Sequence, residues 1–247
     1  MSTDHFKGKD ALTHILEKKK EGLSGFSEVH GAEMPGHICA FADAMRESGF
    51  LLLLLWLILQ LLHIQDFQLF IALAALAAPL IVWKTGRSAC LGWSRLERLH
   101  RLIEQEKYEI EHHRDQEREE LVALYSNKGF EGELLDQIVD VLMADSDRLL
   151  KVMLEEEMGL TLEAFEHPLK QATGALIGST FAAICFLAIL FLLPTIGPFL
   201  ITFGLLAFGG AISAHFEKNR IIDSVVWNVA IAGLSCGLGY FLLKAIV

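Results

Sequence analysis

The chain has 247 residues, of which 53% are hydrophobic, and its formal net charge at pH 7 is −10. That hydrophobic content is too high for an ordinary soluble domain of this length. The charge is unevenly placed, because residues 97–167 contain 20 acidic and 8 basic residues while the rest of the chain is slightly basic. Such an acidic segment repels nucleic acid and attracts cations, so we expect no nucleic-acid partner.

Five apolar stretches come close to the length of about 20 residues that a helix needs to cross a bilayer. They cover residues 49–64 (with a possible start near Ile38), 67–83, 172–193, 199–216 and 224–247. Five buried helices of a soluble core would leave too little polar surface in a chain of this size. The sequence therefore predicts an all-α membrane protein with five transmembrane helices in contact with the lipid bilayer.

The polar segments differ in their content of lysine and arginine. These residues lie in the N-terminal region, after the second span and between the last two spans, whereas the turns at 65–66 and 194–198 contain none. Because basic loops stay on the cytosolic side, we expect the N-terminus and the acidic segment in the cytosol and the C-terminus on the opposite side.

Four regions follow from this pattern. Residues 1–37 are expected to form a cytosolic N-terminal segment, 38–86 the first two spans, 87–168 a cytosolic helical insert and 169–247 the last three spans. Within the first region, residues 10–23 have an apolar face followed by a basic patch. This predicts a short amphipathic helix on the inner leaflet, with a solvated tail as the alternative.

The insert is expected to contain three helices. Residues 87–125 lack proline and have a single glycine, so one long helix can continue from the second span. Gly129 is placed for a turn, and residues 131–143 have apolar residues at helical spacing. A third helix is expected over 147–158, with Asp145 or Ser146 as its N-cap, before Pro168 opens the third span.

The stretch 106–120 contains seven acidic residues and two histidines, and on a straight helix five possible ligands share an arc of about 80°. These are Glu106, Glu109, His113, Glu117 and Glu120. Either this is a solvated acidic face, or a cation offsets the repulsion between like charges. The stretch spans about 21 Å of straight helix, so metal binding requires two or more ions or a break near residues 112–115.

The predicted third helix adds Met153 and Glu157, which are four residues apart, with Glu156 as a weaker candidate beside them. Carboxylates with an imidazole and a thioether suit a divalent transition metal, Fe²⁺ before Mn²⁺ or Zn²⁺. We expect no enzymatic activity, because the chain has no nucleotide loop, no nucleophile with its base and no Glu-x-x-His pattern of a di-iron bundle.

These motifs resemble the vacuolar iron transporter family of plants, yeast and bacteria, over roughly residues 85–245. The resemblance rests on two Glu-x-x-Glu pairs, the helix at 131–143 and the Met-Glu segment before Pro168. It implies that the protein is a homodimer with its conduction path between protomers, that it exchanges metal for protons, and that six residues of the insert bind metal. Those residues are Glu106, Glu109, Glu117, Glu120, Met153 and Glu157.

The first two spans depart from the family pattern. Asp43 and Glu47 are the candidates for acids of the transport path, and Ala89 stands where the family has a methionine. Lys84 and Arg87 lie at the end of the second span, where basic groups oppose cation permeation. Three functions therefore stay open: a transporter that exports or sequesters cytosolic Fe²⁺ or Mn²⁺, a transport-deficient metal sensor, buffer or scaffold, and a structural membrane protein whose acidic helices contact a basic partner.

Overall fold

The structure, a computed structural model, describes residues 34–158 and 166–246, and the helix predicted over residues 10–23 lies outside them. Every regular element in the described residues is a helix. These residues divide into two compact units, one formed by residues 94–158 and the other by residues 34–93 and 166–246.

Five described helices are long and apolar enough to cross a membrane. They are α2 (Gly36–Leu61), α3 (Asp66–His112), α7 (Pro168–Leu192), α8 (Gly197–Phe216) and α9 (Ile221–Ile246). The prediction of an all-α chain with five such helices is therefore confirmed. Several of these helices begin a few residues before their apolar runs. A proline lies just before the helix or in its first turn, as Pro168 does in α7.

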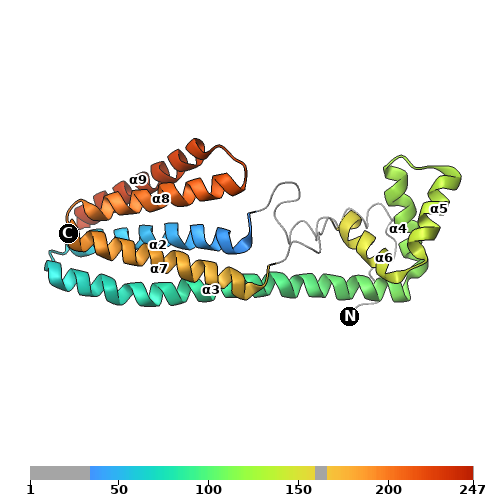
Figure 1. The fold of residues 1–247 in the computed structure, drawn as a ribbon, viewed down its shortest axis with the longest axis horizontal. Coiled ribbons are helices and arrows are strands. Elements are labelled where there is room, and N and C mark those ends of the chain that lie inside the picture. Colours follow the sequence, from blue (N-terminus) through green and yellow to red (C-terminus); the bar gives the residue numbers. More distant parts are fainter. Residues whose placement is uncertain (1–33, 159–165, 247) are drawn as a thin grey trace. The chain divides into compact units, whose positions relative to one another are not determined.

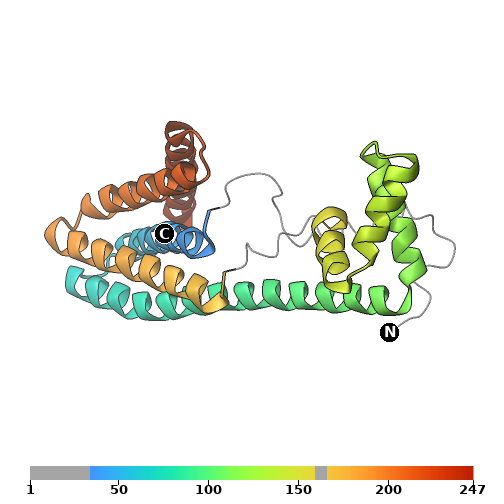
Figure 2. The same ribbon diagram turned by 45° about the vertical axis from the view of Figure 1, so that its right-hand side comes forward.

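The core of the second unit forms where α2, α3 and α7 meet. Leu52 and Leu53 of α2, Leu73 of α3 and Phe186 of α7 are completely buried in one apolar cluster. Figures 1 and 2 show α7 running beside α2 and beside the first part of α3. Many outward apolar side chains of α9, such as Trp227, are exposed in the single chain, as expected for helices surrounded by lipid or by other helices.

Close approach of α2 and α7 depends on two glycines of α7. A methyl group built on Gly174 would overlap the backbone carbonyl of His37, and one on Gly178 would overlap that of Phe41. Small residues at such a crossing let helix backbones pack tightly inside a membrane. A hydroxyl adds a polar contact between α8 and α2, because Thr202 donates to the carbonyl of Gly49 at 3.3 Å.

Glu166 ties the start of α7 to the start of α2. Its carboxylate accepts the backbone N–H of His37 at 2.8 Å, approaches the Nδ1 atom of the same histidine at 2.7 Å and accepts from Lys170 at 2.8 Å. Partial burial raises the pKa of Glu166, but the hydrogen bonds from Lys170 and His37 outweigh it and hold the pKa below its ordinary value. The ionised carboxylate therefore stabilises the fold.

The sign of the resulting pH dependence follows from the lowered pKa. The contribution of Glu166 is present above the unfolded-state pKa of about 4.3 and is lost as the pH falls through the lower folded-state value. We expect Glu166→Gln to unfold at a lower temperature than the wild type at neutral pH, and to lose less stability on acidification. Thermal unfolding in detergent, followed by tryptophan fluorescence, measures both. The matched control is Glu97→Gln, an exposed position of α3, and equal pH profiles for wild type and Glu166→Gln would contradict the assignment.

The first unit contains the end of α3, then α4 (Arg114–Asn127), α5 (Gly132–Met143), α6 (Ser146–Val152) and a π turn over Met153–Glu157. Leu121 of α4, Val139 of α5, Leu149 of α6 and Met153 of the π turn are buried together. The helix predicted over residues 131–143 corresponds to α5, and the turn before it contains Gly129 with φ of +93°. This unit carries all of the insert residues considered as metal ligands.

The start of α6 is capped as the sequence suggests. Asp145 is extended, and its side chain accepts the backbone N–H groups of Asp147 at 2.9 Å and Arg148 at 3.2 Å. These backbone hydrogen bonds lower the pKa of the Asp145 carboxyl. Of the two N-cap candidates, Asp145 therefore has this role, and α6 begins one residue earlier than the predicted third helix.

Candidate metal centre

The acidic stretch is broken into two helices at His113. The α3 helix ends at His112 and α4 begins at Arg114, while His113 itself has the non-helical backbone angles φ −131° and ψ 38°. The His113 carbonyl accepts the N–H groups of Gln116 at 2.9 Å and Glu117 at 3.2 Å, so α4 begins a new hydrogen-bond series. Metal binding by this stretch required either two or more ions or a break near residues 112–115, and the structure has the break. The prediction of one helix that continues as far as residue 125 is wrong.

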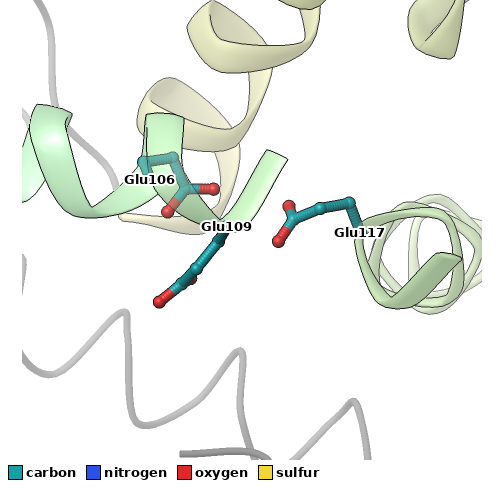
Figure 3. A group of neighbouring side chains, drawn as sticks. All are labelled: Glu106, Glu109 and Glu117. Carbon is teal, nitrogen blue, oxygen red and sulfur yellow. The ribbon is translucent and has the colours of Figure 1, made fainter. Parts of the chain in front are cut away.

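This bend brings glutamates from both helices together. One carboxylate oxygen from each of Glu106, Glu109 and Glu117 lies within 4.8 Å of the others. Figure 3 shows the Glu117 side chain pointing from α4 toward the two glutamates of α3. All three side chains are buried, with Glu117 completely inaccessible. The acidic stretch is therefore more than a solvated face, since it has a buried carboxylate cluster at its bend.

The spacing of these oxygens matches the size of a bound cation. Two oxygens on opposite sides of a divalent ion, each at about 2.1 Å, are about 4.2 Å apart. Separations of up to 4.8 Å therefore need only a small contraction to surround one ion. Oxygen ligands of this kind suit Mn²⁺ and Fe²⁺, and Zn²⁺ also accepts them.

Three further candidates are buried in the same unit. Glu120 follows Glu117 by one turn of α4 and is 2% exposed, while Met153 and Glu157 in the π turn are inaccessible. In the π turn the Met158 N–H donates to the Met153 carbonyl at 3.3 Å, one residue further along than in an α-helix. The predicted third helix therefore ends irregularly. Residues 147–158 contain no proline or glycine from which this π turn could have been predicted.

Two weaker candidates lie differently. Glu156 is exposed and forms an ion pair with Lys128, so the structure does not bring its carboxylate to the cluster. His113 is half-buried at the break, with its ring 6.4 Å from that of Tyr108. The sequence pattern predicted Glu157 as a ligand and Glu156 as a weaker candidate, and of the two the π turn buries only Glu157.

The buried carboxylates of this unit carry negative charge with which a cation would interact favourably. Burying carboxylates is costly unless positive charge or hydrogen-bond donors compensate for the lost water. Several neighbouring basic side chains contact other groups: Arg118 pairs with Asp140 at 2.6 Å, Lys128 pairs with Glu156, and Arg114 donates to the Met143 carbonyl. These three contacts are made with groups other than Glu106, Glu109 and Glu117.

The geometry agrees with a comparison against protein-family models, in which the VIT family model matches residues 93–244. The match covers more than half of the chain. The chain belongs to the vacuolar iron transporter (VIT) family. A search of curated proteins finds no match. Members of the VIT family are transporters rather than enzymes, and together with the five apolar helices the match indicates an integral membrane protein with a role in membrane metal transport.

In this VIT-family chain the two path candidates of α2 are already paired with bases. Asp43 pairs with Arg46 on the same helix, and Glu47 pairs with Lys84 of α3. Arg87 lies 4.0 Å from the Glu47 carboxylate. The sequence placed Lys84 and Arg87 at the end of the second span, and the structure adds that both lie beside Glu47.

Met153 has two possible roles in this VIT-family chain, and substitution separates them. As a buried core residue, it should tolerate leucine at a cost below about 1.5 kcal/mol, whereas alanine should cost about 2–5 kcal/mol. If its thioether also binds metal, Met153→Leu lowers the affinity for Fe²⁺ by about tenfold, and the affinity for the harder ion Mn²⁺ by less.

Thermal unfolding and calorimetric titration measure the two effects on the same protein. The control is Met158→Leu, because Met158 is buried in the neighbouring apolar cluster with Leu99 and Leu154. We expect Met158→Leu to leave metal affinity unchanged. Equal metal affinities for wild type and Met153→Leu would assign Met153 to the core alone.

Proposed function

We propose that this protein transports a divalent transition-metal cation out of the cytosol, either exporting it or sequestering it, with Fe²⁺ as the first candidate and Mn²⁺ or Zn²⁺ as alternatives. The observation that carries this proposal is the buried cluster of Glu106, Glu109 and Glu117 in a chain of the VIT family. The cluster supplies a place to capture the ion, and Glu120, Glu157 and Met153 complete the proposed ligand set. The five apolar helices supply the means to cross the bilayer.

The distribution of basic residues supports a cytosolic position for the glutamate cluster. Arg95, Arg98 and Arg101 follow the apolar run of α3 and precede Glu106 and Glu109 on the same helix. Because such residues remain in the cytosol, the proposed capture site faces the compartment from which metal is removed. The C-terminus then lies on the opposite side of the membrane, and family resemblance implies a homodimer.

Uptake of metal into liposomes containing the purified full-length protein tests the proposal. We expect Fe²⁺ or Mn²⁺ to enter faster than into empty liposomes, and to enter faster still when an imposed proton gradient can be exchanged for the ion. Light scattering in detergent tests the homodimer. Metal binding without uptake under any gradient would contradict the transport proposal.

A second candidate function is favoured by the ion pairs of α2. Because Arg46 and Lys84 neutralise Asp43 and Glu47, the acids proposed for the path are already occupied by positive charge. The protein would then bind metal at the glutamate cluster and act as a sensor, buffer or scaffold without moving the ion. The liposome experiment separates the two candidates, since this one predicts binding with no uptake.

A further inference from the structure

The acids of α2 lie on one face of that helix. Asp43 and Glu47 are four residues apart, so they project in nearly the same direction, and their side chains are 52% and 48% exposed. Both therefore lie at the surface of the single chain rather than in its apolar core.

Each of these acids is held by a base that the fold fixes in place. Arg46 pairs with Asp43, donates to the Asn228 side chain of α9 at 3.2 Å, and has its aliphatic stem against Gly209 of α8. Lys84 reaches Glu47 from α3, and its side chain is only 10% exposed. In the single chain the acids are half exposed, whereas the bases that neutralise them are largely buried.

The burial of Lys84 makes its ammonium a strong competitor for Glu47. An ammonium group carried on a packed helix binds within the molecule, at a high effective concentration compared with a free ion. If Lys84 moved away from Glu47, its positive charge would be left in a largely buried position without this partner, which is unfavourable. A divalent ion must therefore displace Lys84 before it can use both oxygens of Glu47.

We propose that Lys84 is a tethered cation that fills the place of a divalent metal ion at Glu47 and so controls the access of metal to α2. This inference rests on the proposed function, in which Asp43 and Glu47 of α2 are the candidate acids of the transport path. Lys84 is then a specificity-determining residue: it raises the metal concentration at which α2 binds an ion. The competing explanation is a purely structural clamp between α2 and α3.

Binding of Mn²⁺ to the purified full-length protein separates the two explanations without requiring transport. The starting protein carries Glu106→Gln, Glu109→Gln and Glu117→Gln, which remove the glutamate cluster, and free Mn²⁺ is followed by electron paramagnetic resonance. Into this background we introduce Lys84→Met, Lys84→Gln as a polar alternative should the first variant fail to fold, and Lys84→Arg as the charge-conserving control.

Lys84→Met or Lys84→Gln is expected to bind Mn²⁺ at least tenfold more tightly than the background, and adding Glu47→Gln should abolish the gain. Lys84→Arg should show no gain in Mn²⁺ affinity. Arg87→Met, at an exposed position 4.0 Å from Glu47, should show a smaller gain in affinity than Lys84→Met. Two results would overturn the proposal: no gain in a folded Lys84 variant, or a gain that persists after Glu47→Gln.

A transport measurement on the chain with its glutamate cluster intact distinguishes this inference from the proposed function. Faster uptake by Lys84→Met than by wild type at low Mn²⁺ concentration supports the inference. If wild type and Lys84→Met take up Mn²⁺ at the same rate, the result counts against the inference. If no variant takes up metal, the proposed function fails, and the Mn²⁺ binding result still decides the role of Lys84.

Discussion

Replacing Glu106 and Glu109 together by glutamine is expected to lower the affinity for Fe²⁺ or Mn²⁺ by at least about 100-fold, which corresponds to about 2.7 kcal/mol. Two of the three carboxylates that lie within 4.8 Å of one another are lost in this variant. The amide keeps the size of the side chain but removes its charge, and the affinity of an oxygen-lined site depends strongly on the number of charged ligands. Calorimetric titration of the full-length protein measures the effect.

A matched control lies on the same two helices. Glu111 and Glu119 are exposed, so the double variant Glu111→Gln with Glu119→Gln makes the same change in net charge away from the cluster. We expect this control to retain its affinity within about threefold, because exposed charges at longer range are screened by salt. An equal loss of affinity in both variants would show that the acidic segment attracts metal only through its total charge.

The same variants change the stabilisation that metal provides. A ligand that binds the folded state raises the free energy of unfolding by about 2.7 kcal/mol when its concentration is 100 times its dissociation constant. We therefore expect added Mn²⁺ to raise the unfolding temperature of wild type and of the control. The rise should disappear in the variant without Glu106 and Glu109. A rise of unchanged size there would place the ion at other residues.

Replacing Gly178 by alanine is expected to have a large effect on folding. The added methyl group would overlap the backbone carbonyl of Phe41, and a backbone atom cannot move aside as a flexible side chain can. The α2 and α7 helices must separate to relieve the overlap, which also opens the cluster around Phe186 and Leu53. We expect a loss of several kcal/mol, comparable to the upper range for overpacked cores.

Gly233 and Gly237 of α9 are matched controls, because a methyl group built on either meets nothing within 4 Å. Alanine there should be neutral or stabilising by up to about 1 kcal/mol, since glycine is a poor helix former. Gel filtration and thermal unfolding in detergent measure the three variants side by side. If Gly178→Ala unfolded at the wild-type temperature, the close contact of α2 and α7 would be contradicted.

Most of the helical architecture can be predicted from local sequence patterns. The five apolar runs, the amphipathic spacing of residues 131–143, the turn at Gly129 and the cap at Asp145 all depend on residues within a few positions of one another. Helix periodicity and capping are properties of this range, so a single sequence is sufficient to predict them. The Glu-x-x-Glu pairs are found in the same way, as residues on one face of a helix.

The arrangement of the site depends on longer-range packing. A straight helix would have kept Glu117 well away from Glu106, and the bend at His113 brings them together once Leu121, Val139 and Met153 pack into one core. Local spacing equally could not decide that Glu157 is buried while Glu156 pairs with Lys128, because a π turn shifts the register there.

Hydropathy, charge and helical spacing are local properties of the chain, so they predict a membrane protein with five spanning helices and an acidic segment able to attract cations. The folded structure is needed to show which carboxylates meet, and that Lys84 rather than Arg46 pairs with Glu47. Those pairings join residues on different helices. They are decided by how the helices bend and pack, which no short stretch of sequence specifies.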